Sequence, residues 1–112
     1  MDSPPSTINA CMIYVTTGSD DEAKTIARRL VTEKLAACVN ILGPATSIYT
    51  WNGNMEEAQE FVLVCKTSRQ CADAAVARIK ALHSYETPSI AVYTMAGGDQ
   101  PFLDWIGEST RP

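Results

Sequence analysis

Positive charge and long apolar runs are both scarce in this sequence. Nine lysines and arginines stand against 13 acidic residues, which gives a net charge of −4. Binding to DNA or RNA relies on a basic surface, so a nucleic-acid partner is disfavoured. No apolar run approaches the ~20 residues that span a bilayer, and we expect no membrane partner. Residues 1–9 lack the basic and apolar regions of a secretory signal, which favours a cytoplasmic protein.

Histidine is nearly absent, and the cysteines are not paired in sequence. There is one histidine, and the four cysteines form no C-x-x-C motif. Three of them, Cys11, Cys38 and Cys65, lie in apolar runs, where a free thiol behaves as a small hydrophobe. We therefore predict free thiols rather than disulfides or a cysteine-only zinc site. No Ser-His-Asp or Cys-His arrangement can be argued from the sequence, so no enzymatic activity is predicted.

The residues that are present are typical of one globular domain. Hydrophobic residues make up 46% and charged residues 20% of the 112, a composition that can bury one sizeable core. Residues 1–9, which include Pro4 and Pro5, are predicted to form a flexible tail. Residues 10–112 are predicted to form a single domain.

Hydrophobic periodicity divides this domain into seven elements. They are a strand at residues 11–15, a helix over about 19–35, long strands at 37–51 and 55–66, a second helix closed by 83–88, a strand at 89–95, and a short last helix near Pro101. This order is the split βαβ arrangement. We predict an α+β, ferredoxin-like βαββαβ sandwich with an extra C-terminal helix, and with both long helices on one face of an antiparallel sheet.

Three local signals support these elements. Ser19 and Glu22 have the spacing of a capping box, which starts the first helix. Gly43-Pro44 interrupts the first long strand and is interpreted as a bulge or bend rather than as its end. Asn52-Gly53 is the dipeptide that a type I′ hairpin turn prefers, because both central residues need positive φ. Residues 37–66 are therefore predicted to form one long bent hairpin.

The other face of the sheet also needs to be covered. Residues 11–15, 61–65 and 90–93 are continuously apolar, whereas a sheet with one wet face should alternate. Two helices can cover only one face, so we expect a second copy of the chain on the other. The long hairpin, with Glu56, Glu57 and Glu60 in places that a monomer core cannot use, is predicted to pair with a neighbouring subunit.

Four motifs resemble those of a known family. Residues 35–41 read Leu-Ala-Ala-Cys-Val-Asn-Ile, residues 47–53 follow an S-x-Y-x-W-x-G pattern, and Lys66-Thr67 follows the next strand. Residues 82–88 resemble the family's H-P-Y-E-x-P motif, with Ser84 where proline is usual. Over about residues 12–106 the chain is similar to the CutA divalent-cation tolerance proteins.

This resemblance implies a ferredoxin-like fold and a tight homotrimer held by β-pairing between subunits. It also implies a likeness to the PII signalling trimers, and a role in tolerance of copper and other divalent metals, usually in the cytoplasm. It implies no established reaction. Some members carry a cysteine late in the first strand, where this chain has Tyr14, Val15 and Thr16, so no thiolate ligand is expected there.

The candidate site residues fall into two groups. His83 and Glu86 are the candidate metal ligands, because copper favours nitrogen with oxygen support. One histidine cannot complete a site alone, so symmetry copies or hairpin carboxylates would have to add ligands. The alternative is that His83 contacts the last carbonyls of its helix. The second group consists of residues expected to line a cleft between subunits: Tyr49, Trp51, Lys66 and Tyr85.

Two functions follow from these residues. The first is a trimeric protein that binds divalent metal ions, with copper favoured, and contributes to cation tolerance. The second is a PII-like trimer that senses a small anionic ligand between its subunits. Acylphosphatases share the order of elements, but residues 16–21 are acidic and would repel phosphate. RNA-binding domains share it too, but their basic, aromatic strands are missing.

Overall fold

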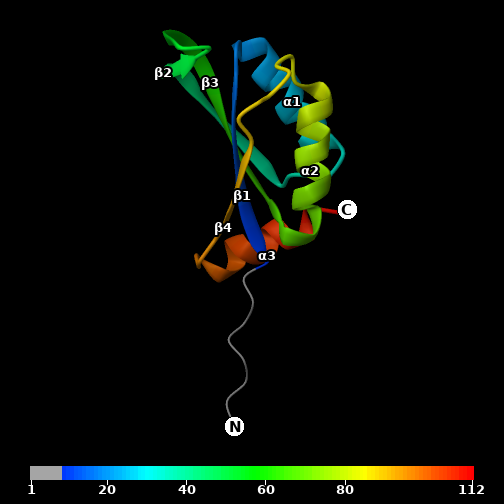
Figure 1. Ribbon diagram of the computed structural model, residues 1–112. Helices are drawn as coiled ribbons and strands as arrows, with labels where there is room; N and C mark the ends of the chain where they lie inside the picture. The colour runs from blue at the N-terminus through cyan, green and yellow to red at the C-terminus, as the bar shows by residue number, and fades with distance from the viewer. Residues whose placement is uncertain (1–8) are drawn as a thin grey trace.

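The computed structural model describes residues 9–112, which form four strands and three helices (Figure 1). In chain order these are β1 Ala10–Thr17, α1 Asp20–Thr32, β2 Cys38–Trp51, β3 Asn54–Ser68, α2 Arg69–Leu82, β4 Ala91–Thr94 and α3 Gln100–Glu108. The predicted tail lies outside the described residues, except for Asn9. The predicted order of seven elements is confirmed.

The strands form one antiparallel sheet in the order β2-β3-β1-β4. Helices α1 and α2 lie on the same side of this sheet (Figure 1), as right-handed crossovers require. The predicted ferredoxin-like α+β fold is therefore confirmed. We call the side that carries α1 and α2 the helix face and the opposite side the open face.

The core fills the space between the helix face and the two long helices. Ile13, Val15 and Leu63 point from β1 and β3 into it and are fully buried. They meet residues of the helices that are equally inaccessible: Ile26, Leu30, Ala75 and Ile79. Full burial of each large aliphatic side chain stabilises the fold by about 1.5–3 kcal/mol, so these contacts hold the helices on the sheet.

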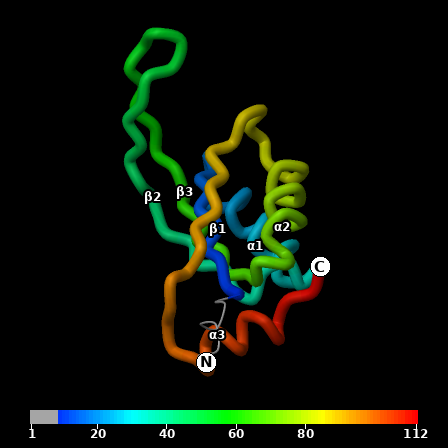
Figure 2. The backbone as a smooth tube through the Cα atoms, turned by 60° about the horizontal axis from the view of Figure 1, so that its bottom comes forward, coloured from blue at the N-terminus to red at the C-terminus, as the bar shows by residue number. Residues whose placement is uncertain are grey.

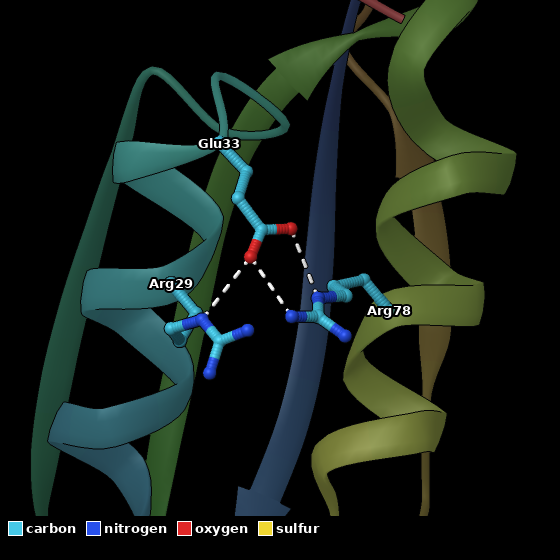
Figure 3. A network of polar contacts seen from close by, with 3 residues as sticks. All are labelled: Arg29, Glu33 and Arg78. Carbon is cyan, nitrogen blue, oxygen red and sulfur yellow. Dashed lines mark hydrogen bonds and ion pairs between the residues drawn. The ribbon is translucent and has the colours of Figure 1, made fainter.

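A charged contact also joins the two helices (Figure 3). Arg78 of α2 donates two hydrogen bonds of 2.9 Å to the carboxylate of Glu33, just after α1, and Arg29 donates a third of 3.1 Å. Chiefly the bonds from Arg78, and then those from Arg29, hold the pKa of Glu33 below its usual value. The group lies at the surface, so it orients the helices more than it stabilises them.

All four cysteines are free, as predicted. Cys11, Cys65 and Cys71 are buried, and Cys38 is partly buried. Burial, with a smaller effect of the neighbouring Cys38, raises the pKa of Cys65 to about 12. Because the thiolate is the reactive form, Cys65 acts as a packing residue.

Two local expectations need correction. Ser19 accepts from the backbone N–H of Glu22, as a capping box requires, but the Glu22 carboxylate accepts from the backbone N–H of Ser84 at 2.9 Å instead of turning back to Ser19. Glu22 therefore joins the start of α1 to the loop after α2. The last strand is also shorter than predicted, because regular pairing with β1 covers only Ala91–Thr94.

Beyond the core, β2 and β3 continue as a projecting hairpin (Figure 2). We call this part, residues 45–60, the arm. Its turn has Asn52 and Gly53 at φ of 52° and 81°, which confirms the predicted type I′ geometry. The register shifts by one residue between Leu42 and Ala45, so the predicted bulge at Gly43-Pro44 is confirmed. A Cβ at Gly43 would lie 2.5 Å from the Phe61 ring, which explains the glycine there.

The bulge changes which side chains of β2 point to each face. Before it, Ile41 pairs with core residue Leu63 and lies on the helix face, whereas Leu42 pairs with Val62 and lies on the open face. After it, Tyr49 pairs with Glu56, which lies on the open face because successive residues of β3 alternate. The odd-numbered residues of β2 thus move from the helix face to the open face.

The open face is apolar and only partly covered within one chain. At one end α3 packs against it, where Ile106 is buried with Ala10 and Ala37. Elsewhere large side chains remain accessible: Tyr14 at 38%, Leu42 at 54% and Tyr93 at 54%. Their exposure agrees with the continuously apolar strands of the sequence, which predict that both faces of the sheet need to be covered.

Candidate functional site

A cavity of about 650 Å³ lies between the arm and the loop that follows α2. Ten residues line it: Thr16, Ser47, Ile48, Tyr49, Trp51, Glu60, Tyr85, Glu86, Thr87 and Ser89. Its volume is within the range of small-molecule sites. It brings together four of the six predicted site residues, namely Tyr49, Trp51, Tyr85 and Glu86.

The arm supplies one wall of the cavity through the bulge. Ser47, Tyr49 and Trp51 alternate along β2 and share one side of it. Because the bulge shifts the alternation by one residue, this side is the open face, to which Glu60 of β3 also belongs. In a regular strand Tyr49 and Trp51 would point to the helix face instead.

Glu60 is the buried charged group of the cavity. The residue is only 8% exposed, and Oε2 of its carboxylate accepts a 3.0 Å hydrogen bond from the Tyr85 hydroxyl. The sequence analysis groups Glu60 with the arm carboxylates that a monomer core cannot use. This expectation is wrong, because Glu60 is already buried within one chain. The alternation of β3 places Glu60 beside Val62, but no local signal identified Tyr85, 25 residues later, as its partner.

Negative charge dominates the electrostatics of the cavity. Burial first, and then the hydrogen bond to Glu60 and the charges of Glu60 and Glu22, raise the pKa of Tyr85 to about 12. Among the lining residues the charged ones are Glu60 and Glu86. The lining contains no lysine, arginine or histidine that could offset this negative charge. The geometry therefore disfavours the small anionic ligand that was expected as an alternative from the sequence.

The coupling between Tyr85 and Glu60 can be measured directly. Tyr85 is expected to titrate near pH 12, and Tyr85→Phe should remove that step from the ultraviolet absorbance of tyrosinate. Glu60→Gln should lower the pKa of Tyr85 toward its usual value of 10, because the neighbouring negative charge is gone while burial remains. A late step that persists in Tyr85→Phe would contradict this assignment.

His83 lies beside the cavity and has both ring nitrogens engaged. Nε2 is 2.7 Å from the carbonyl oxygen of Thr16, and Nδ1 is 3.0 Å from the backbone nitrogen of Tyr85. A carbonyl can only accept, so Nε2 carries the proton, and Nδ1 accepts from the N–H of Tyr85. The residue is 9% exposed and its partner carbonyl lies on β1, not on the last turn of α2 as the alternative from sequence had it.

The predicted metal ligands do not form a complete set within one chain. Residues 9–112 contain no group of three or more histidine, cysteine, aspartate or glutamate side chains placed to hold one ion. Glu86 lines the cavity, three residues after His83, and is exposed. Lys66 pairs with Met12 and Cys38 in the body of the sheet and does not line the cavity.

Comparisons with known proteins agree on one family. Residues 11–109 match the family described as CutA1 divalent ion tolerance protein. The divalent-cation tolerance protein CutA of Thermus thermophilus is 43% identical over 99 residues, which cover 88% of this chain and 96% of that protein. The chloroplastic protein CutA 1 of Oryza sativa is 35% identical over 111 residues, or 99% of this chain and 63% of that protein.

The fold is similar as well. The crystal structure of CutA from Xylella fastidiosa superposes with a TM-score of 0.90 at 36% identity, covering 92% of this chain and 99% of that one. Within residues 9–112, no helix is long and apolar enough to cross a membrane.

Proposed function

Because the chain belongs to the CutA1 divalent ion tolerance family, as its motifs predict, we propose that it acts in divalent-cation tolerance as a homotrimer that binds a divalent metal ion, with copper favoured. The observation that carries this proposal is the apolar open face beside a projecting arm. The two features are what a subunit needs in order to bury a face and pair strands with its neighbours.

The surface chemistry supports self-association. Tyr14, Leu42 and Tyr93 form an exposed apolar group on the open face, and an isolated soluble chain rarely leaves such a group uncovered. The arm adds Trp51 at 59% and Met55 at 80% exposure. A closed ring of like subunits covers these surfaces without leaving a free strand edge.

A metal site would then be shared between subunits. One chain supplies fewer than three ligands at any point within residues 9–112, whereas copper and zinc sites use three or four. His83 is oriented as metal-binding histidines usually are, with one N–H donated to a backbone carbonyl. The lone pair of Nδ1 would coordinate the ion, and Nδ1 would then give up the hydrogen bond that it accepts from the N–H of Tyr85. Glu86 would supply an oxygen ligand.

The cysteines and His83 bear on the cellular location and on the type of activity. Four free thiols are typical of a reducing compartment, and they support a cytoplasmic location as part of this proposal. We propose a binding role and not a catalytic one, because the hydrogen bonds of His83 within residues 9–112 go to backbone groups and not to a side chain that it could activate as a nucleophile.

Copper titration calorimetry tests the metal proposal. The assembled protein is expected to bind Cu²⁺ with a Kd below ~100 μM, about −5.5 kcal/mol. His83→Ala should abolish this binding, and Glu86→Gln should weaken it, while Asp73→Asn, at an exposed position of α2, serves as the control. Equal copper affinity in His83→Ala, with an unchanged melting curve, would show that His83 is not a ligand.

A further inference from the structure

Glu60 has acceptor capacity that the chain does not use. Its Oε2 accepts from Tyr85, and within residues 9–112 its Oε1 has no hydrogen-bond partner. No fully buried side-chain nitrogen or oxygen in that part of the chain lacks a partner, so Oε1 is accessible from the cavity. This oxygen, in a residue only 8% exposed and without a cation beside it, can accept a hydrogen bond from a ligand in the cavity. A ligand that carries positive charge would make that hydrogen bond stronger.

The rest of the lining fits an organic cation better than a metal ion. Three aromatic residues, Tyr49, Trp51 and Tyr85, line the cavity, and aromatic faces attract ammonium groups but do not coordinate metals. Thr16 and Ser89 add two hydroxyl groups, hydrogen-bonded to each other at 3.0 Å, whose lone pairs can accept from an N–H. A metal would need more ligands than this cavity offers.

We propose that this cavity binds a small organic cation, in which an ammonium group is carried on an apolar or aromatic body. The ammonium would donate to Oε1 of Glu60, and the body would lie against Tyr49 and Trp51. Glu86 lines the same cavity, but Glu60, Tyr49 and Trp51, which would contact the cation, are not proposed copper ligands, so the inference does not depend on the copper site. A neighbouring subunit on the open face would close the cavity further and strengthen the charge interaction.

The test uses two probes that differ in charge and little in shape, benzylammonium and benzyl alcohol. Binding is measured by calorimetry on the protein in its solution assembly, and by Trp51 fluorescence in a Trp105→Phe background. Benzylammonium is expected to bind with a Kd of about 1 mM or lower, and benzyl alcohol at least tenfold more weakly, since the charge interaction is lost. Inorganic phosphate and Zn²⁺ alone are run as the anionic and metallic alternatives.

Variants assign the effect to the cavity. Glu60→Gln keeps the shape and the hydrogen bond from Tyr85 but removes the charge, and should weaken benzylammonium binding about tenfold or more. Glu57→Gln is the matched control, because Glu57 is on the same strand, three residues away and outside the lining, and it should bind as the parent does. Tyr85→Phe should weaken binding less than Glu60→Gln, because the ring remains.

Three results would overturn the proposal. They are equal binding of the two probes, unchanged benzylammonium binding in Glu60→Gln, and displacement of benzylammonium by phosphate but not by other amines. Thermal unfolding of each variant separates loss of binding from loss of folding. Mass and copper affinity are measured on the same samples, so a failure here is distinguishable from a failure of the proposed function.

Discussion

Replacing both Leu42 and Tyr93 with glutamate is expected to reduce the assembled protein from three chains to one. Both residues are 54% exposed on the open face, where the proposed trimer buries them. Two carboxylates there would lose their hydration with no partner, which costs several kcal/mol per charge. Light scattering should give about three times 12.1 kDa for the parent and a single chain mass for the variant.

Val31→Glu is the matched control for this variant. Val31 is 44% exposed but lies on α1, on the other side of the sheet. The same added charge there should leave the trimer intact. A parent protein that is monomeric at micromolar concentration, or a double variant that keeps the parent's mass, would contradict the trimer.

The second large effect is expected in the core. Leu63→Ala should lower the free energy of unfolding by about 2–5 kcal/mol, because it removes buried methyl groups and leaves a cavity. Leu63 is fully buried on β3, between β1 and β2, and packs under both long helices. Typical domains have about 5–15 kcal/mol in total, so this one change would remove a large share.

Urea unfolding at a fixed chain concentration measures this loss, since assembly makes stability depend on concentration. Val31→Ala, at a half-exposed site on α1, should change the free energy by less than about 0.5 kcal/mol. A Leu63→Ala loss no larger than that of Val31→Ala would mean that the core packs differently from the arrangement described.

The fold could be predicted from the sequence because its signals are local. Continuous apolar runs identified strands, helical spacing identified the helices, and Asn52-Gly53 identified the arm's turn, since positive φ at two successive positions restricts the choice of residues. Gly43-Pro44 located the bulge for a similar reason, because proline cannot donate in a ladder. The family motifs lie on these same elements.

The site was only partly predictable because its contacts are long-range. Tyr49, Trp51 and Tyr85 were named from sequence, and they do meet. The burial of Glu60 depends on Tyr85, and the position of the loop that carries Tyr85 depends on the bonds of Glu22 and His83 to it. No pattern within a few residues of Glu60 contains that information.

The bulge also determines which side chains of β2 form the cavity wall. Between Leu42 and Ala45 the strand holds one residue more than its partner. If the same residues paired without the bulge, β2 would slip by one residue against β3 beyond Leu42, and Ile48 and Thr50 would take the open face in place of Tyr49 and Trp51. An aliphatic and hydroxyl wall would replace an aromatic one. Deleting one residue of the bulge would instead keep Tyr49 opposite Glu56 and leave the aromatic wall in place, so recognition here depends on the pairing register of β2 against β3 and not on the length of β2 alone.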